Sequence, residues 1–464
     1  MDVKGSQVEF KRDIYHELLK WKQRGTRQAL ELSGARQVGK TYLLQKFAKE
    51  NFKNVVYINM ATASGVRFEE LLSQAERNTE YLTDEAKPLM EALKQFSEDF
   101  LNTPDTIVVV DEIQESQKVY NYIRTFTRKL NCYLAVTGSY LGRLLEKGFF
   151  LPAGDLYTVT LETLSFREFA DVFGLQTLYD TIDLYGASAE EDYQKLRQSF
   201  AIYQRIGGYP SVVKVYLETK DFTACRREQM RLIELFTNES KRYFKDILDT
   251  ELFSKMFNAI SINLIREKQG QKDLVRELSD IIYKQESGRI TKRSVNHAIG
   301  WLQASHIIGY ADESIDCDHL DLRVNARFYF MDIGMAHLFL SLTGEDVSTV
   351  KGIVAENFVY CSLHKRTGRD IAGEQPWFAI YQKNHGELDF YARSLVDFKD
   401  YGIEVKSEDG TSKTAQALLK DGKLDYLYYL KGTSHGGITD DGKVRTVPLY
   451  LSDRITFDLG KGQN

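Results

Sequence analysis

The stretch LSGARQVGKT contains a pattern of residues that binds phosphate. Gly34 is followed, after four residues, by Gly39, Lys40 and Thr41. Glycines allow the backbone to wrap an anion, the lysine reaches the β- and γ-phosphates, and the hydroxyl holds Mg²⁺. A simple glycine turn explains the glycines but not the lysine and hydroxyl together. We therefore expect ATP or GTP, with Mg²⁺, on a loop made of Gly34, Ala35, Arg36, Gln37, Val38, Gly39, Lys40 and Thr41.

Two acids follow an apolar run later in the chain. The run IVVVDEIQ stays apolar up to Asp111 and Glu112. An acid that ends a buried strand can reach the Mg²⁺ hydration shell, and the next acid can polarise an attacking water. In CYLAVTGS, which ends in Thr137, Gly138 and Ser139, a polar side chain could lie beside Asp111 and sense the γ-phosphate, although TGS is also an ordinary turn. The expected roles are metal ligands for Thr41 and Asp111, catalytic residues for Lys40 and Glu112, and nucleotide contact for Ser139.

A second group of acids lies in GELDFYARSLVDFKDYGIEVKS, near the end of the sequence. In two adjacent strands, alternation places Glu387 and Asp389 on one face and brings Glu404 and Lys406 together. The residues expected to pack on the other face are Leu388, Phe390 and Val405. Two carboxylates that hold Mg²⁺ and a lysine that orients water can hydrolyse a phosphodiester. Asp389, Glu404 and Lys406 are thus candidate catalytic residues, the two acids as metal ligands; the alternative is a hairpin with a solvated acidic face.

The elements that must position these residues follow from the hydrophobic pattern. From residue 28, the strand-like runs QALELSG, VVYINM, TIVVVDE and CYLAVTGS alternate with helical blocks, which predicts a parallel sheet flanked by helices. TIVVVDE is apolar on both faces, as a central strand should be. From about 165 to 250 helical periodicity dominates, interrupted by the turn GGYP, and indicates a helical lid. Beyond 346, a first helix, the strand-like runs WFAIYQ, ELDFYA, YGIEVKS and TVPLYLS, and a second helical run, AQALLKDGKLDYLYYLKG, predict a small α/β domain.

Residues 254–312 contain three helical blocks followed by the strand-like IIGYADE and RFYFMDI, which together suggest a winged helix. Thr291 can cap the third helix. The residues that this helix would present to a DNA groove are Lys292, Arg293, Asn296 and His297. The residues on its buried side are Val295, Ile299 and Leu302. The alternative is a packing or protein-interaction module, because the nearby acids Glu277, Asp280 and Glu286 dilute the positive field.

Composition limits the class of protein. A chain of 464 residues exceeds one typical core and predicts two to four domains. A net charge of -5 argues against a protein that coats nucleic acid over its whole surface. The four cysteines lack metal-site or disulfide spacing, and no apolar run reaches the roughly 20 residues of a membrane helix. We expect a soluble cytoplasmic protein with no membrane association.

The motifs described above, together with LSFREF, RFYFMDIGMA and the terminal AENFVY, resemble a known family. From about residue 10 to 455 the chain is similar to bacterial and archaeal AAA-type ATPases that carry the C-terminal domain of unknown function 4143. The resemblance implies an ATPase core similar to AAA+ and STAND-type NTPases, a winged-helix segment and an end domain similar to the PD-(D/E)xK nuclease fold. In that fold Glu356 of AENFVY would be a further metal ligand. The alternation described above leaves Glu387 as a candidate that supports the metal ligands without binding the metal itself. Candidate arginine fingers are Arg167, Arg205 and Arg242.

The resulting prediction is an α/β protein with four parts: a P-loop core (1–165), a helical lid (166–250), a winged-helix-like domain (251–345) and a nuclease-like domain (346–464). Its function would be ATP hydrolysis that controls a nuclease-like domain acting on DNA. The alternative is a regulatory ATPase whose end domain binds a protein or nucleic acid without cutting it. A homo-oligomer is also compatible with the sequence.

Overall fold

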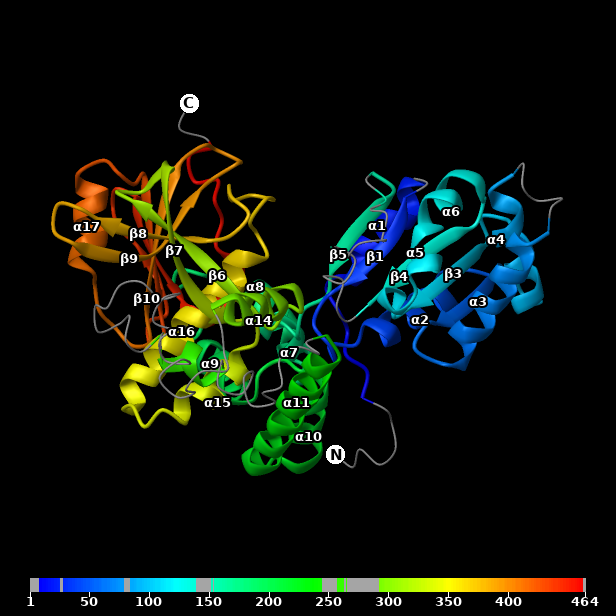
Figure 1. The fold of residues 1–464 in the computed structure, drawn as a ribbon. Helices are drawn as coiled ribbons and strands as arrows, with labels where there is room; N and C mark the ends of the chain where they lie inside the picture. The colour runs from blue at the N-terminus through cyan, green and yellow to red at the C-terminus, as the bar shows by residue number, and fades with distance from the viewer. Residues whose placement is uncertain are drawn as a thin grey trace. The chain divides into compact units, whose positions relative to one another are not determined.

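The computed structural model describes residues 8–25, 28–78, 84–138, 152, 154–243, 257–262, 264 and 292–461, with side chains omitted at 240–243, 292–297 and 319–325. The chain forms two compact units. The amino-terminal unit comprises Lys11–Thr163 and Trp301–His306, and the carboxy-terminal unit comprises Met1–Phe10, Leu164–Gly300 and Ile307–Asn464. Each unit has its own sheet (Figure 1).

The amino-terminal unit is built on a five-stranded sheet in the order β2-β3-β4-β1-β5. Every neighbouring pair is parallel, as the alternation of strand-like and helical runs predicted. The strands are β1 (Ala29–Ser33), β2 (Asn54–Asn59), β3 (Thr106–Asp111), β4 (Tyr133–Thr137) and β5 (Leu156–Thr160). Strands β1 and β3 are buried along their whole length, and for β3 this burial explains why TIVVV reads as a continuous apolar run.

Helices cover both faces of this sheet (Figure 1). They are α1 (Tyr15–Arg24), α2 (Lys40–Asn51), α3 (Ala63–Glu76), α4 (Ala86–Phe96), the 3₁₀ turn η2 (Ile113–Glu115), α5 (Gln117–Asn121) and α6 (Ile123–Lys129). A core of apolar side chains from α3, α4, α5 and α6 packs on β2, β3 and β4, with Phe68, Leu93, Val110 and Phe126 among its buried members. This packing fixes the carboxyl ends of β1 and β3, where the phosphate loop and the acid pair follow.

The described part of the segment predicted as a helical lid consists of helices joined by loops. Its helices are α7 (Phe166–Val172), α8 (Gln176–Thr181), α9 (Glu190–Ile206), α10 (Pro210–Thr219) and α11 (Phe222–Tyr243). Ser165 begins α7 with a reciprocal capping box to Glu168. The ring of Phe200 in α9 lies 4.7 Å from that of Phe358 and 6.0 Å from that of Tyr450. These helices therefore pack on the carboxy-terminal α/β part, in the same compact unit.

The carboxy-terminal sheet has eight strands in the order β12-β13-β11-β10-β9-β8-β6-β7. The strands are β6 (Ile308–Ile315), β7 (Asp318–Phe330), β8 (Trp377–Tyr381), β9 (Gly386–Arg393), β10 (Asp400–Lys406), β11 (Tyr426–Lys431), β12 (Gly437–Ile438) and β13 (Val444–Pro448). The helical elements are α14 (Lys292–Ala304), α15 (Ile333–Ser341), α16 (Val347–His364), α17 (Lys413–Lys420) and the 3₁₀ helix η4 (Leu449–Arg454). The run AQALLKDGKLDYLYYLKG, expected to be helical, forms α17 and then strand β11, which lies between β13 and β10. The predicted α/β domain is also larger than expected, because two strands from before residue 346, β6 and β7, join it.

Those two strands are the hairpin predicted as the wing of a winged helix. β6 pairs antiparallel with β7, as expected, but β6 also pairs in parallel with β8, from Asp312 beside Trp377 to Ile315 beside Ile380. In α14, Ile299 and Leu302 are buried as predicted. The side chains of the expected groove-facing residues, the whole of the second helical block (272–286) and about half of the first (256–268) lie outside the described residues. The winged-helix assignment remains a prediction.

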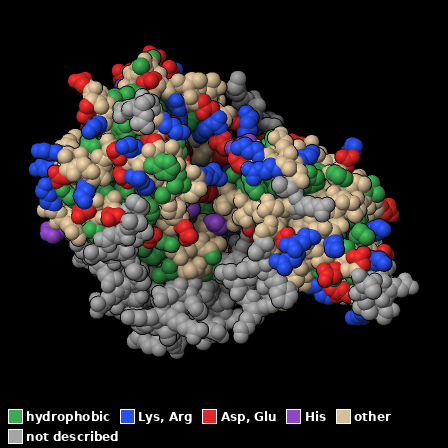
Figure 2. All heavy atoms as spheres, turned by 90° about the horizontal axis from the view of Figure 1, so that it is seen from above, with side chains coloured by type: hydrophobic (Ala, Val, Ile, Leu, Met, Phe, Trp, Pro, Cys, Tyr) green, Lys and Arg blue, Asp and Glu red, His purple; other side chains and the backbone are tan. Residues whose placement is uncertain are grey.

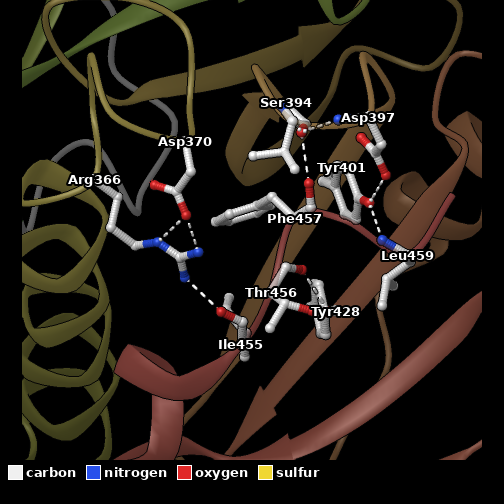
Figure 3. Close-up of polar contacts among 11 residues, drawn as sticks. Arg366, Asp370, Ser394, Asp397, Tyr401, Tyr428, Ile455, Thr456, Phe457 and Leu459 are labelled. Atoms are coloured by element: carbon white, nitrogen blue, oxygen red, sulfur yellow. Dashed lines mark hydrogen bonds and ion pairs between the residues drawn. The ribbon is translucent and has the colours of Figure 1, made fainter. Parts of the chain in front are cut away.

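The end of the described chain is fastened across the carboxy-terminal sheet (Figure 3). Arg366 donates to the carbonyl of Ile455 at 2.6 Å, and Tyr428 donates to that of Thr456 at 2.8 Å. The Ser394 hydroxyl donates to the carbonyl of Phe457 at 2.5 Å. These contacts hold β11 and the residue that follows β9 against one backbone segment, in the same sheet as β9 and β10, which carry the candidate acids.

Within the described ranges, no helix is both long enough and apolar enough to cross a bilayer. Cys132, Cys225 and Cys317 are buried free thiols, and Cys361 is a half-buried one. The structure therefore pairs none of these four cysteines in a disulfide.

Candidate nucleotide site and carboxylate cluster

The phosphate loop lies between the end of β1 and the start of α2, and its two glycines are required for different reasons. Gly34 has φ +134°, and a Cβ there would lie 2.0 Å from the backbone oxygen of Leu161. Gly39 has φ +99° but no atom within 4 Å of such a Cβ. Position 34 therefore requires glycine because the Leu161 backbone lies too close for any side chain. Position 39 requires it only because its φ is unfavourable for other residues. The residues between them in the loop are Ala35, Arg36, Gln37 and Val38.

Lys40 opens α2 and its side chain folds over the loop. Its ammonium donates to the carbonyls of Gly34 at 2.8 Å and Ala35 at 2.7 Å, and the residue is buried. The positive charge is thus held where the backbone curves around the phosphate position, at the positive end of a helix dipole. A nucleotide phosphate would offer stronger acceptors than these neutral carbonyls.

Thr41 and Asp111 are in direct contact, although 70 positions separate them in the sequence. The Thr41 hydroxyl donates to Oδ2 of Asp111 at 2.8 Å, and Asp111 is buried at the end of β3. A hydroxyl and a carboxylate side by side, facing the loop that holds the phosphates, are the hard oxygen donors that Mg²⁺ takes. The residues present therefore fit an Mg²⁺ that accompanies the nucleotide.

Two side chains that the sequence did not predict, Tyr57 and Gln114, position Asp111 and Glu112. The Tyr57 hydroxyl in β2 donates to Oδ2 of Asp111 at 2.7 Å, and burial together with this bond raises the pKa of Tyr57 to about 12. Gln114, almost fully buried, donates to the Glu112 carboxylate at 2.5 Å. Glu112 itself has φ +52°, an uncommon conformation for a non-glycine residue. Gln114 stands within the motif IVVVDEIQ, so its place in that motif was the available signal.

The sensor and arginine-finger predictions remain untested. The Thr137 hydroxyl donates to the carbonyl of Leu32 at 2.8 Å and so joins β4 to β1. Ser139 lies outside the described residues. The Arg167 guanidinium forms an ion pair with the Asp180 carboxylate at 2.7 Å. The guanidinium of Arg205 lies 3.8 Å from the centre of the Phe222 ring. The Arg242 side chain is not among those described.

Among the candidate residues of the carboxy-terminal unit, Asp389, Glu404 and Lys406 lie close together. Asp389 accepts the backbone N–H of Val405 at 2.8 Å, and Lys406 donates to Glu404 at 2.5 Å. Asp389 is 6% exposed and Glu404 is 3% exposed. The alternative of a solvated acidic face is therefore wrong for these two acids, because both are enclosed by the domain.

A β-bulge changes the strand alternation that the sequence predicted around Asp389. Trp377 of β8 pairs with Tyr391 of β9, whereas Ala379 pairs with Leu388, so two steps along β8 match three along β9. Leu388 packs in the cluster that includes α17, but the Phe390 ring lies 5.9 Å from that of Tyr329, on the α16 side. The prediction that Leu388 and Phe390 share one face was wrong, because the extra residue in β9 shifts the alternation.

Glu356 is held away from this cluster by a buried arginine. Its carboxylate accepts hydrogen bonds from Arg327 at 2.9 Å and from the Tyr329 hydroxyl at 2.7 Å. Arg327 also pairs with Glu387 at 2.7 Å and stacks over the Phe378 ring at 4.4 Å. Both Arg327 and Glu356 are buried. Glu387, which the sequence left as a candidate supporting the metal ligands, thus belongs to an ion-pair network with Arg327 and Glu356.

Glu356 and Glu404 lie on opposite faces of the sheet. Glu404 pairs with Tyr429, whose hydroxyl accepts the N–H of Ser412 at the start of α17, whereas Glu356 projects from α16. In the part of the chain that the structure describes, no three His, Cys, Asp or Glu side chains lie together so as to hold a metal ion. The residues therefore do not fit the three-acid metal site expected from Glu356, Asp389 and Glu404, since α16 covers the other side of β10.

The parallel sheet, the glycine loop that enters a helix, and the Thr41–Asp111 pair define the amino-terminal unit as a P-loop nucleotide-binding domain. Residues 26–170 match the family model of the AAA domain. This segment is accordingly an AAA-type domain with an ATP-binding function. The match ends at residue 170, so the C-terminal part of the family resemblance remains a prediction.

Several solved structures are similar to the chain at low identity. A Walker-type ATPase of Pyrococcus abyssi is 15% identical, with a TM-score of 0.45 and coverage of 73% of this chain and 99% of that one. The ORC1 protein of Aeropyrum pernix, solved with DNA, is 13% identical, with a TM-score of 0.31 and coverage of 76% and 94%. The RuvB branch migration motor of Thermotoga maritima is 13% identical, with a TM-score of 0.28 and coverage of 65% and 89%. No curated protein matches the sequence.

Proposed function

We propose that the chain hydrolyses ATP and that its nucleotide state controls the carboxy-terminal unit. The observation that supports hydrolysis most directly is the Thr41–Asp111 contact beside the phosphate loop, with Glu112 next in sequence. Bound Mg²⁺ would neutralise charge on the β- and γ-phosphates. Lys40 would exchange its two loop carbonyls for phosphate oxygens, and Glu112 would accept a proton from the attacking water.

Gln114 gives the Glu112 carboxylate a fixed direction. Its amide donates to one oxygen, Oε2, and because Gln114 is buried this anchor is held by packing. A base with one oxygen anchored presents its other oxygen reproducibly, which favours proton abstraction from a positioned water. Replacing Gln114 with Ala should therefore lower kcat more than it weakens ATP binding.

Phosphate release by the purified full chain, in Mg²⁺ and ATP, tests this function. Glu112→Gln should reduce kcat by roughly 10²–10⁴-fold, the contribution of a general base, while ATP binding persists. Lys40→Ala should weaken binding by at least about tenfold, because a charge-assisted contact is lost. Glu115→Gln, an acid in the same 3₁₀ turn, is the matched control. Equal turnover in wild type and Glu112→Gln, or none in either, would contradict the proposal.

For the carboxy-terminal unit we favour the alternative in which it binds a partner without cutting it. This proposal is supported by the engagement of Glu356 by Arg327 and by its separation from Glu404. Asp389, Glu404 and Lys406 remain together and offer a polar, buried cluster beside α17. Among the side chains that Figure 2 colours on the face it presents, acidic and basic groups are interspersed.

Two measurements separate the nuclease hypothesis from the binding one. Incubation of the full chain with plasmid DNA and Mg²⁺, with and without ATP, should leave the plasmid intact. Cleavage that Asp389→Ala or Lys406→Ala abolishes would instead establish the nuclease. ATP turnover with and without DNA then addresses the partner: stimulation would indicate DNA, and indifference would favour a protein.

A further inference from the structure

The phosphate loop is linked by hydrogen bonds at both ends to the short connector, residues 161–163, that follows β5. At the start of the loop, the N–H of Leu161 donates to the carbonyl of Ser33 at 2.9 Å. At its end, Arg12 forms a bridge: one guanidinium nitrogen donates to the carbonyl of Val38 at 2.9 Å, and another donates to that of Glu162 at 2.5 Å. All of these residues belong to the amino-terminal unit.

The Arg12–Val38 bond also determines where the next donor of the loop points. The structure has no cis peptide bond among its described residues, and in a trans peptide the C=O and N–H point in opposite directions. Because the Val38 carbonyl points to Arg12, the N–H of Gly39 points away from Arg12. Gly39 directly precedes Lys40, whose ammonium lies on the loop carbonyls of Gly34 and Ala35. The N–H of Gly39 is therefore one of the loop donors available to a phosphate.

We propose that Arg12 is a positioning residue for nucleotide binding, which acts by holding the Val38–Gly39 peptide in its phosphate-binding orientation. The same guanidinium makes the connector at Glu162 respond to the loop, since one group bonds to both backbones. Glu162 precedes by two positions Leu164, where the sequence of the carboxy-terminal unit resumes. The inference rests on ATP binding at this site and not on hydrolysis.

Neither the motif nor the family comparison assigns this role. Arg12 lies 26 positions before Val38 and 150 before Glu162, and it precedes the segment 26–170 that matches the AAA domain. Its guanidinium suits the task because it presents several donors in a rigid plane and can join two carbonyls at once. A lysine ammonium has no such fork, so it would hold only one of the two backbones well.

The test compares Arg12→Ala, Arg12→Lys and Lys20→Ala in the full chain. Lys20 is the control because it is an exposed cation on α1 whose ammonium contacts Glu17. Binding of a fluorescent ATP analogue is measured by titration, and the Tm is measured without nucleotide. Arg12→Ala should raise the Kd by roughly ten- to a hundredfold, the loss of one hydrogen bond to a charged group. Arg12→Lys should show a smaller rise, and Lys20→Ala should match wild type.

Hydrogen exchange distinguishes a positioning role of Arg12 from a purely structural one. In wild type, nucleotide should slow exchange in residues 34–41 and also at 161–163. In Arg12→Lys the protection at 161–163 should be reduced while that at 34–41 is largely kept. Wild-type ATP affinity in folded Arg12→Ala, or unchanged affinity and connector protection in Arg12→Lys if Arg12→Ala fails to fold, would overturn the proposal. A wild-type protein that binds ATP without hydrolysing it would leave this inference standing and contradict only the proposed hydrolysis.

Discussion

The carboxylate of Asp332 accepts a hydrogen bond from the backbone N–H of Gly208, at 2.8 Å and across 124 positions of sequence. The same side chain begins α15 by accepting the N–H of Met335 at 3.0 Å. The carbonyl of Gly208 in turn accepts the N–H of Leu164 at 2.8 Å. The three motifs LSFREF, GGYP and MDIG therefore meet at one buried junction, which explains their presence without a catalytic role.

Substitutions at this junction should destabilise the carboxy-terminal unit. A Cβ at position 208 would lie 2.2 Å from the backbone oxygen of Leu164, so Gly208→Ala should cost about 1–3 kcal/mol or more. Asp332→Ala would leave the buried N–H of Gly208 without its acceptor, which should cost about 1–3 kcal/mol. Urea unfolding measures both effects. The control Gly352→Ala, with no atom near the added Cβ in α16, should raise the unfolding free energy by about 0.5–1 kcal/mol.

The two glycines of the phosphate loop should respond differently to alanine. Gly34→Ala must displace the Leu161 backbone, and with it the connector, so ATP binding should be lost and stability reduced. Gly39→Ala meets no atom and imposes only backbone strain, of about 1–3 kcal/mol. Titration with an ATP analogue and thermal unfolding distinguish the two variants. Equal losses in both would argue that backbone conformation, and not the approach to Leu161, decides the role of Gly34.

Arg327 should be essential for stability because it is the buried partner of two acids. Arg327→Met would leave Glu356 uncompensated in the interior, which should cost about 3–5 kcal/mol in urea unfolding. Adding Glu356→Gln to that variant should recover part of the loss, since the buried charge is then removed as well. No recovery in the double variant would mean that packing over Phe378, and not charge, explains the effect.

The same network makes a prediction about metal removal. If Arg327 supplies the positive charge for Glu356 and Glu387, then EDTA should not lower the Tm of the nucleotide-free full chain. Addition of Mn²⁺ should leave the Tm unchanged as well. A Tm increase with Mn²⁺ that Glu356→Gln abolishes would show that this acid binds a metal ion after all.

His337 predicts a pH dependence of stability. Burial lowers the pKa of His337, and repulsion from Arg205 and Arg226 lowers it further. In the unfolded chain the pKa of this histidine is about 6.5. Above that pH the ring is neutral in both states, and its contribution to the free energy of unfolding is fully present. This contribution is lost as the pH falls through the lower pKa of the folded state. The Tm should therefore decrease as the pH is lowered from about 8 to about 5, because the unfolded chain binds the proton more strongly. His337→Gln should remove this part of the decrease, and Arg226→Gln should reduce it.

Local sequence was sufficient for most elements of the fold. Strands β1 to β4 of the amino-terminal sheet, and the helices α2, α5 and α6, follow from apolar runs and 3.6-residue periodicity, which depend on neighbours in sequence. The edge strand β5 was not predicted, and most of its residues are only partly buried or exposed. The antiparallel pairing of β9 with β10 and the proximity of Glu404 to Lys406 followed from alternation in the same way. The face of Phe390 could not be predicted, because a bulge in one strand is visible only against its partner.

What the sequence by itself determined is the nucleotide site, because a phosphate loop is built from consecutive backbone groups and its spacing specifies its geometry. Tertiary structure alone decided which distant groups complete or disable a site. It placed Arg12 on the Val38 carbonyl, Tyr57 on Asp111 and Arg327 on Glu356. These contacts depend on which faces of helices and strands pack together. That packing is selected by a burial free energy summed over many residues, so no short motif in the sequence indicates it.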